Sequence, residues 1–112
     1  MDIEITDVDQ VTKAVLMGRL DTTNVNRCES RFIDSLVPRG RPAIVDLAGV
    51  SFVASLGIRM LLSTARALSQ KGAKLALFGA NPLVADIFET TALSDIIPVA
   101  DTEAEAIALV TG

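Results

Sequence analysis

The chain has 112 residues, a formal net charge of −4, no histidine and a single cysteine, and half of its residues are apolar. With no histidine and only one cysteine, the sequence lacks an essential component of structural zinc sites and of catalytic sites that pair serine or cysteine with histidine. The ten lysines and arginines are dispersed, so we expect no nucleic-acid-binding surface. From the missing histidine and the lack of a metal-ligand cluster we also expect no enzymatic activity and no metal or cofactor. Carboxylate-only or Mg²⁺-dependent chemistry passes the histidine criterion and needs a separate test.

The first third of the chain predicts a β-hairpin followed by a helix. Ile3–Ile5 and Lys13–Met17 are typical of short strands, and the polar stretch Thr6–Gln10 separates them. The segment Gly18–Thr23 is rich in residues that turn a chain or cap a helix. Apolar residues then recur at intervals of three and four, which predicts one face of a helix that ends near Pro38. These apolar residues are Val25, Cys28, Phe32 and Leu36.

The middle third predicts a strand, a loop and a second helix. Ala43–Leu47 is a short apolar strand, and Gly49–Ser55 is expected to be a loop whose last residue caps the helix that follows. An apolar stripe marks the buried face of that helix, and Gly72 lies where a left-handed helix end is expected. The stripe consists of Ile58, Leu61, Leu62, Ala65 and Leu68.

The last third predicts two strands and two helices. Lys74–Phe78 alternates as a strand does, and Asn81-Pro82 is a typical helix start with Asn as the cap. Ile96–Val99 is expected to be an edge strand, and Thr102 with Glu105 has the spacing of a capping box for a last helix through Ile107 and Val110. The buried face of the helix after Pro82 is expected to be Leu83, Val84, Ile87 and Phe88.

The predicted order is β-β-α-β-α-β-α-β-α. A hairpin followed by β-α units implies an α/β fold with a mixed sheet of four to five strands and four flanking helices, because the later crossovers must be right-handed and parallel. We expect one domain over residues 1–112. The apolar runs are shorter than the ~18 residues of a membrane span, and the acidic start is unlike a secretion signal. We therefore expect a cytoplasmic protein that does not insert into a membrane.

Ser55 is the residue whose position is most informative. It lies at the predicted mouth of a helix, where the first backbone N–H groups lack partners and carry a partial positive charge. A phosphate on its hydroxyl would be stabilised there. The alternative is that Ser55 only caps the helix. Gly57, two residues later, allows another backbone to approach closely.

The stretch from Asp46 to Leu62 resembles the signature of STAS domains. In that signature a strand ending in Asp-Leu is followed by a loop, a Phe and a short Asp-Ser-Ser/Thr-Gly-Leu element, for which this chain has Phe52 and then Ala54-Ser55-Leu56-Gly57. Gly18-Arg19-Leu20-Asp21 is similar to the Gly-Glu-Leu-Asp element of the same family. The resemblance extends over essentially the whole chain, and it implies a STAS-like mixed sheet flanked by helices.

The resemblance also implies a function, that of an anti-sigma factor antagonist. In this branch a partner anti-sigma factor, which is a serine kinase, phosphorylates the serine that aligns with Ser55. The unphosphorylated form binds that partner and frees the sigma factor, and a serine phosphatase is a further expected partner. The implied partner-binding residues surround the start of the second long helix: Asp21, Thr22, Ala54, Leu56, Gly57 and Arg59. Asp21 has the alternative of capping the first helix, and Arg59 of being a solvated surface residue.

Two other functions remain open at this stage. Within the family, the chain could be an unphosphorylated STAS subunit of a membrane transporter or of a stress-signalling assembly. Outside it, a receiver-like phosphotransfer domain would place its acceptor at Asp46, but such a site needs clustered carboxylates for Mg²⁺ and a lysine after a later strand. The acids Asp7 and Asp9 precede another strand, and no lysine follows Lys74. This context disfavours the receiver.

Overall fold

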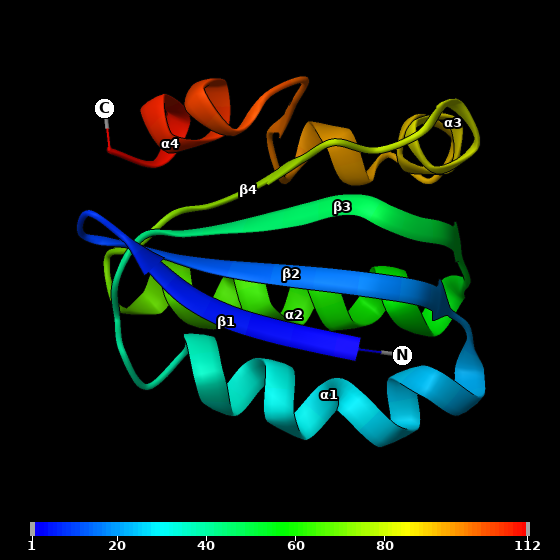
Figure 1. Cartoon of the computed structure of the whole chain (residues 1–112), viewed down its shortest axis with the longest axis horizontal. Helices are drawn as coiled ribbons and strands as arrows, with labels where there is room; N and C mark the ends of the chain where they lie inside the picture. Colours follow the sequence, from blue (N-terminus) through cyan, green and yellow to red (C-terminus); the bar gives the residue numbers. More distant parts are fainter. Residues whose placement is uncertain (1, 112) are drawn as a thin grey trace.

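The computed structural model describes residues 2–111, and its strands and long helices follow one another in the predicted order (Figure 1). One short 3-10 helix, η1, was not predicted. The strands are β1 (Asp2–Val8), β2 (Val11–Leu20), β3 (Ala43–Val53), β4 (Leu75–Phe78) and β5 (Val99–Ala100). The helices are α1 (Thr22–Leu36), α2 (Ser55–Gln70), α3 (Pro82–Thr90), η1 (Leu93–Asp95) and α4 (Glu103–Thr111).

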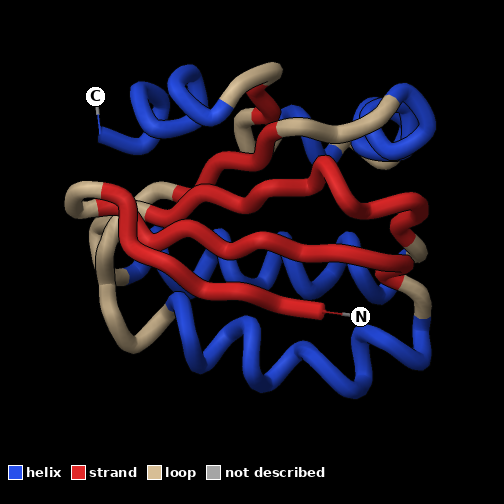
Figure 2. Tube along the Cα trace, viewed as in Figure 1, coloured by secondary structure: helices blue, strands red, loops and turns tan. Residues whose placement is uncertain are grey.

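The five strands form one mixed sheet in the order β1-β2-β3-β4-β5, in which only β1 is antiparallel to its neighbour. Helices cover the sheet on two sides: α1 and α2 lie together on one side, and α3 and α4 lie on the other (Figures 1 and 2). This is the α/β arrangement that the order of elements predicted. The parallel connections place the ends of β2 and β3 at the same edge of the sheet, where α1 and α2 begin.

The core lies on both faces of β3 and β4. Val45 and Leu77 belong to the large cluster that includes α1 and α2, whereas Ile44 and Phe78 pack with α4. Strands covered on both faces are apolar at consecutive positions, as expected for the parallel part of a sheet. The four residues predicted for the buried face of α1 are all buried. One of them is Cys28, and burial raises the pKa of its thiol.

Two strand boundaries differ from the sequence prediction. The hairpin strands extend through most of Thr6–Gln10, and only Asp9 and Gln10 form the turn. Polar side chains are tolerated there because β1 is an edge strand with one open face. The expected loop Gly49–Ser55 is also wrong over most of its length, because β3 continues to Val53 in register with β2. Burial of Val50 and Val53 accounts for this extension.

The predicted buried faces of α2 and α3 and the predicted last strand also need correction. Leu83 is 55% exposed, so the buried face of α3 is formed by Val84 and Phe88. Ile96 is 67% exposed and the last strand is Val99–Ala100, as expected where Pro98 cannot donate to the ladder.

On α2, Leu62 and Ala65 are only half-buried, while Met60 and Thr64 are buried. The predicted starts of the last two helices are confirmed, because the Asn81 side chain accepts a hydrogen bond from Val84 N and the Thr102 hydroxyl accepts one from Glu105 N.

Candidate functional site

Ser55 is the first residue of α2, and it is not the cap that the sequence suggested. The cap residue is Ala54, whose side chain cannot accept a hydrogen bond from the first turn. The difference arises because β3 runs to Val53 and leaves only one residue between strand and helix. Ser55 is exposed, and none of the residues 2–111 forms a hydrogen bond with its hydroxyl. The hydroxyl is therefore available for modification beside uncapped backbone N–H groups.

Gly57 fixes the first turn of α2 against the sheet. It is buried, and a Cβ atom at this position would lie 3.0 Å from Leu20 Cβ and 3.0 Å from Val53 Cγ1. The close approach expected at Gly57 is therefore made by the chain's own β2 and β3. Gly57 is therefore packed within the chain itself, and it positions the turn of α2 that carries Ser55. Its contact with a partner stays a prediction.

Asp21 caps α1 and also pairs with Arg19. Its Oδ1 accepts a hydrogen bond of 2.9 Å from Asn24 N, and its Oδ2 lies 3.7 Å from Arg19 Nε. The capping role left open for Asp21 is therefore present, and Thr22 follows it as the exposed first residue of the helix.

The starts of α1 and α2 are joined through the backbone. Leu20 lies opposite Val53 in the parallel pairing of β2 and β3, and the carbonyl of Leu20 accepts a hydrogen bond of 2.9 Å from Ala54 N. Asp21 and Ser55, the residues that follow Leu20 and Ala54, are therefore held at one edge of the sheet. The structure brings together the two motifs that the sequence placed 34 residues apart, counted from Asp21 to Ser55.

Arg19 and Phe52 were not among the predicted site residues. Arg19 lies opposite Phe52 in the sheet, and its guanidinium carbon is 4.8 Å from the centroid of the Phe52 ring. Only the register of β2 against β3 creates this contact, so no local sequence pattern could have found it. The one available signal was that both residues lie inside the two motifs.

The other predicted site residues lie on the first turns of α2. Arg59 is exposed and one helical turn beyond Ser55, a spacing at which the side chains are neighbours. Leu56 is half-buried and packs against the main core cluster. Leu56 therefore offers only part of its side chain to a partner.

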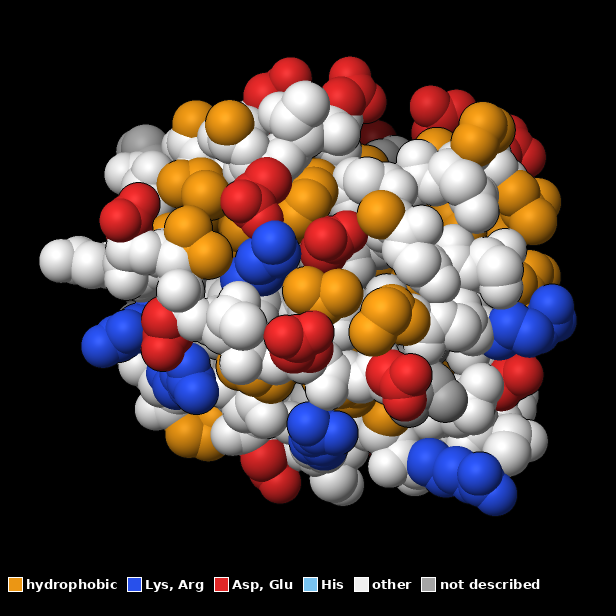
Figure 3. Space-filling view, in the orientation of Figure 1, with side chains coloured by type: hydrophobic (Ala, Val, Ile, Leu, Met, Phe, Trp, Pro, Cys, Tyr) orange, Lys and Arg blue, Asp and Glu red, His pale blue; other side chains and the backbone are white. Residues whose placement is uncertain are grey.

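Within residues 2–111 no group of three metal-ligating side chains is present, and Asp46 Oδ1 accepts a hydrogen bond from Ala48 N. On the face in front of β1 and β2, acidic, basic and hydrophobic side chains are interspersed (Figure 3). None of the helices in the described part of the chain has both the length and the apolarity that a membrane crossing requires.

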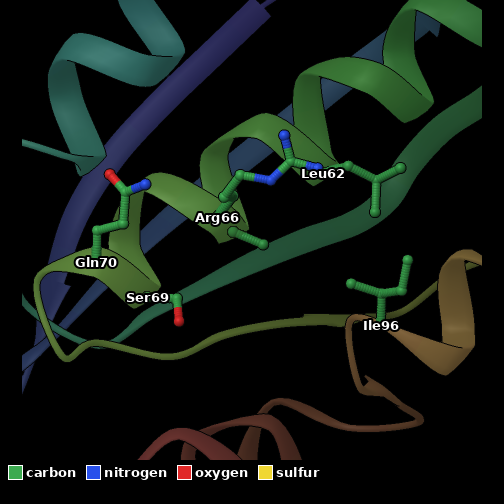
Figure 4. Close-up of a pocket in the computed structure, with 6 residues that line it drawn as sticks. Leu62, Arg66, Ser69, Gln70 and Ile96 are labelled. Carbon is green, nitrogen blue, oxygen red and sulfur yellow. The ribbon is translucent and has the colours of Figure 1, made fainter.

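A cavity of about 370 Å³ lies at the other half of α2, away from Ser55. Leu62 on α2 and Ile96 beyond η1 point toward one another from its two sides, and Ser69 lies farther along α2 (Figure 4). Arg66 and Gln70 also line the cavity. It contains none of the predicted site residues.

Two bacterial proteins are similar to this chain over nearly its whole length. BtrV of Bordetella bronchiseptica, assigned to the anti-sigma factor antagonists, is 29% identical over 96% of this chain and 93% of its own length. The anti-sigma-B factor antagonist of Staphylococcus aureus is 29% identical over 94% of this chain and 98% of its own length.

Solved structures share the fold. A protein from Thermotoga maritima described as an anti-sigma factor antagonist superposes with a TM-score of 0.89 at 20% identity, covering 98% of this chain and 95% of its own. The phosphorylated form of the Bacillus cell fate determinant SpoIIAA has a TM-score of 0.69 at 24% identity, over 96% and 97%. Part of the murine anion transporter Slc26a9 also matches, with a TM-score of 0.72 at 17% identity over 93% of this chain and 18% of the transporter.

The family match covers nearly the whole described chain. The STAS domain family matches residues 2–106, a range that includes both motifs and the entire sheet. STAS anti-sigma factor antagonists are regulatory proteins without enzymatic activity, which agrees with the expectation from composition. The chain belongs to the STAS domain family.

Proposed function

We propose that the chain, as a single STAS domain over residues 1–112, is an anti-sigma factor antagonist controlled by phosphorylation of Ser55. The observation that carries the proposal is the state of Ser55: exposed, without a hydrogen-bond partner among residues 2–111, and first in a helix whose cap has no side-chain acceptor. The unphosphorylated form would bind a kinase-type anti-sigma factor, a serine phosphatase would reverse the modification, and both would act in the cytoplasm.

The proposed binding surface surrounds the start of α2. It consists of Asp21, Thr22, Ala54, Leu56 and Arg59, with Ser55 at its centre. Thr22, Ser55 and Arg59 are exposed, and Asp21, Ala54 and Leu56 are half-buried. The backbone bond between Leu20 and Ala54 keeps the two halves of this surface in register.

Phosphorylation would act on binding far more than on folding. A phosphate carries about −1.5 to −2 charges at neutral pH. At the N-terminus of α2 this charge is favourable, because the first N–H groups point toward it, by about 0.3–1 kcal/mol. A partner surface shaped for a hydroxyl supplies no counter-charge of its own, and burying the phosphate against it costs several kcal/mol. Arg59, one turn beyond Ser55, would offset part of that cost. The fold would persist while the complex is lost.

A phosphotransfer assay tests the proposal. Kinase-type anti-sigma factors from the same organism are incubated with labelled ATP and either the wild type, Ser55→Ala or the control Ser63→Ala, which removes another exposed hydroxyl of α2. The proposal expects label in the wild type and in Ser63→Ala and none in Ser55→Ala. Label retained in Ser55→Ala would refute it.

The alternative within the family is a STAS subunit of a transporter or of a stress-signalling assembly. The fold-level match to part of Slc26a9 is the observation in its favour. Parallel pull-downs with wild type and Ser55→Asp distinguish the functions, because a transporter or assembly subunit would be captured equally by both variants. The proposed antagonist would lose its anti-sigma factor on Ser55→Asp.

A further inference from the structure

Arg19 contacts two neighbouring side chains beside the proposed binding surface, and its side chain is 59% exposed. The Phe52 ring lies 4.8 Å below its guanidinium carbon, and Asp21 Oδ2 lies 3.7 Å from its Nε. Its backbone carbonyl accepts a hydrogen bond of 2.8 Å from Asn24 Nδ2. Both the side chain and the backbone of Arg19 are therefore constrained.

A strand irregularity creates this arrangement. Gly18 pairs with Val50 and Arg19 pairs with Phe52, so Ser51 is an extra residue on β3 at this point. Gly18 has φ of 113°, a conformation that an L side chain rarely adopts. Without the extra residue Arg19 would lie opposite Ser51, and no ring would support its guanidinium. Bulges of this kind often redirect a side chain next to a functional site.

The charges around Arg19 leave it able to bind an external anion. Asp21 uses Oδ1 to cap α1 and Oδ2 to pair with Arg19 Nε, so its carboxylate is already engaged within the protein. The guanidinium has five N–H donors in a planar fork, and the two terminal nitrogens are not occupied by Asp21. The fork geometry matches a carboxylate with two parallel hydrogen bonds.

From this geometry we infer that Arg19 selects the partner, by binding a carboxylate side chain on the contact surface of the anti-sigma factor. The inference rests on the proposed function and adds a residue and a partner chemistry to it. The Phe52 ring and Asp21 hold the guanidinium in place before binding, so little side-chain entropy is lost when the carboxylate arrives. Arg19 therefore contributes specificity as well as charge.

The chain provides a closely matched control in Arg41. Arg41 is 53% exposed and lies 3.8 Å from Asp7 Oδ1, so it has nearly the same exposure and the same kind of ion pair as Arg19. It precedes β3, whereas Arg19 lies opposite the end of β3. On β2 the same interval runs from Thr12, opposite Ala43, to Arg19, opposite Phe52, which is about 23 Å at roughly 3.3 Å per residue. Arg19→Glu and Arg41→Glu change the net charge equally.

The test measures the affinity of each variant for the anti-sigma factor that binds the wild type, by titration calorimetry with circular dichroism as the folding control. Arg19→Glu is expected to weaken binding about tenfold or more, because two carboxylates then face one another. Arg41→Glu is expected to change the affinity less than about threefold, because a distant surface charge is screened. Arg19→Lys keeps the charge without the planar fork, whereas Arg19→Gln removes the charge. The affinity of Arg19→Lys should therefore lie between those of the wild type and Arg19→Gln.

Salt dependence gives a second readout. The advantage of wild type over Arg19→Gln should shrink as the salt concentration rises, because an exposed ion pair is screened. Equal affinity of Arg19→Glu and Arg41→Glu would overturn the inference. If Ser55→Glu still lost the partner in the same series, the proposed function would stand and only the inference about Arg19 would fail. If the wild type bound no anti-sigma factor, the proposed function and the inference would both fail.

Discussion

The backbone carbonyl of Leu20 accepts a hydrogen bond of 2.9 Å from the N–H of Ala54, which ties the end of β2 to the residue before α2. The residues that follow, Asp21 and Ser55, begin the two helices that cover one side of the sheet. A single backbone contact therefore sets the position of the α1 cap relative to the proposed phosphorylation site. Changes at this junction should affect both stability and binding.

Asp21→Ala should lower the free energy of unfolding by about 1 kcal/mol, because α1 loses the acceptor for Asn24 N. Asp21→Asn keeps an acceptor oxygen and should lie much closer to the wild type. Urea denaturation followed by circular dichroism measures both variants. Equal stability of Asp21→Ala and wild type would contradict the capping role.

Gly57→Ala tests the packing of α2 against the sheet. In an exposed helix interior the change from Gly to Ala would stabilise by about 1 kcal/mol. Here the new Cβ would lie 3.0 Å from Leu20 Cβ and 3.1 Å from the Leu20 carbonyl oxygen, and overpacking costs about 1–3 kcal/mol. We expect a net loss of stability in thermal unfolding, whereas Ser63→Ala on the exposed face should be neutral or slightly stabilising. A more stable Gly57→Ala would show that this contact is looser than described.

The ion pair between Lys13 on β2 and Glu103 on α4 should give a pH-dependent contribution to stability. The hydrogen bond to Glu103 raises the pKa of Lys13 above its usual value of 10.5, although burial acts in the opposite direction. A raised pKa in the folded state means that the contribution is complete below the unfolded-state pKa and is lost as the pH rises through the folded-state pKa.

Glu103→Gln should therefore lower the melting temperature at pH 8, and its difference from the wild type should shrink as the pH is raised past 10.5. The effect should be small, under about 1 kcal/mol, because the pair is partly exposed. Glu105→Gln on the same helix is the control for the loss of one negative charge. A difference that stays constant up to alkaline pH would argue against the pair.

Local patterns were sufficient where burial follows a regular period. The spacing of Val25, Cys28, Phe32 and Leu36 identified the buried face of α1, and Asn81-Pro82 identified the start of α3. The two motifs also identified the edge of the sheet at which the candidate site lies. These features depend on residues close together in the chain.

The features that could not be predicted depend on contacts between distant segments. The end of β3 at Val53 follows from its register with β2. Gly49 and Ser51 interrupt the apolar pattern there, so the local sequence does not indicate a strand. The same register brings Arg19 over Phe52 and leaves Ala54, rather than Ser55, as the α2 cap. The fully buried residues of α3 are Val84 and Phe88, and Leu83 lies outside this narrow buried face. Periodicity alone does not show how wide the buried face of a short helix is.

The switch at Ser55 is tested most directly by titration calorimetry of Ser55→Glu and Ser55→Ala against the anti-sigma factor that binds the wild type, with circular dichroism to show that both variants fold. Since each 1.4 kcal/mol changes affinity tenfold, a penalty of several kcal/mol predicts that Ser55→Glu binds at least about a hundredfold more weakly than the wild type. Ser55→Ala should bind like the wild type. Equal affinity of folded Ser55→Glu and wild type would contradict the switch.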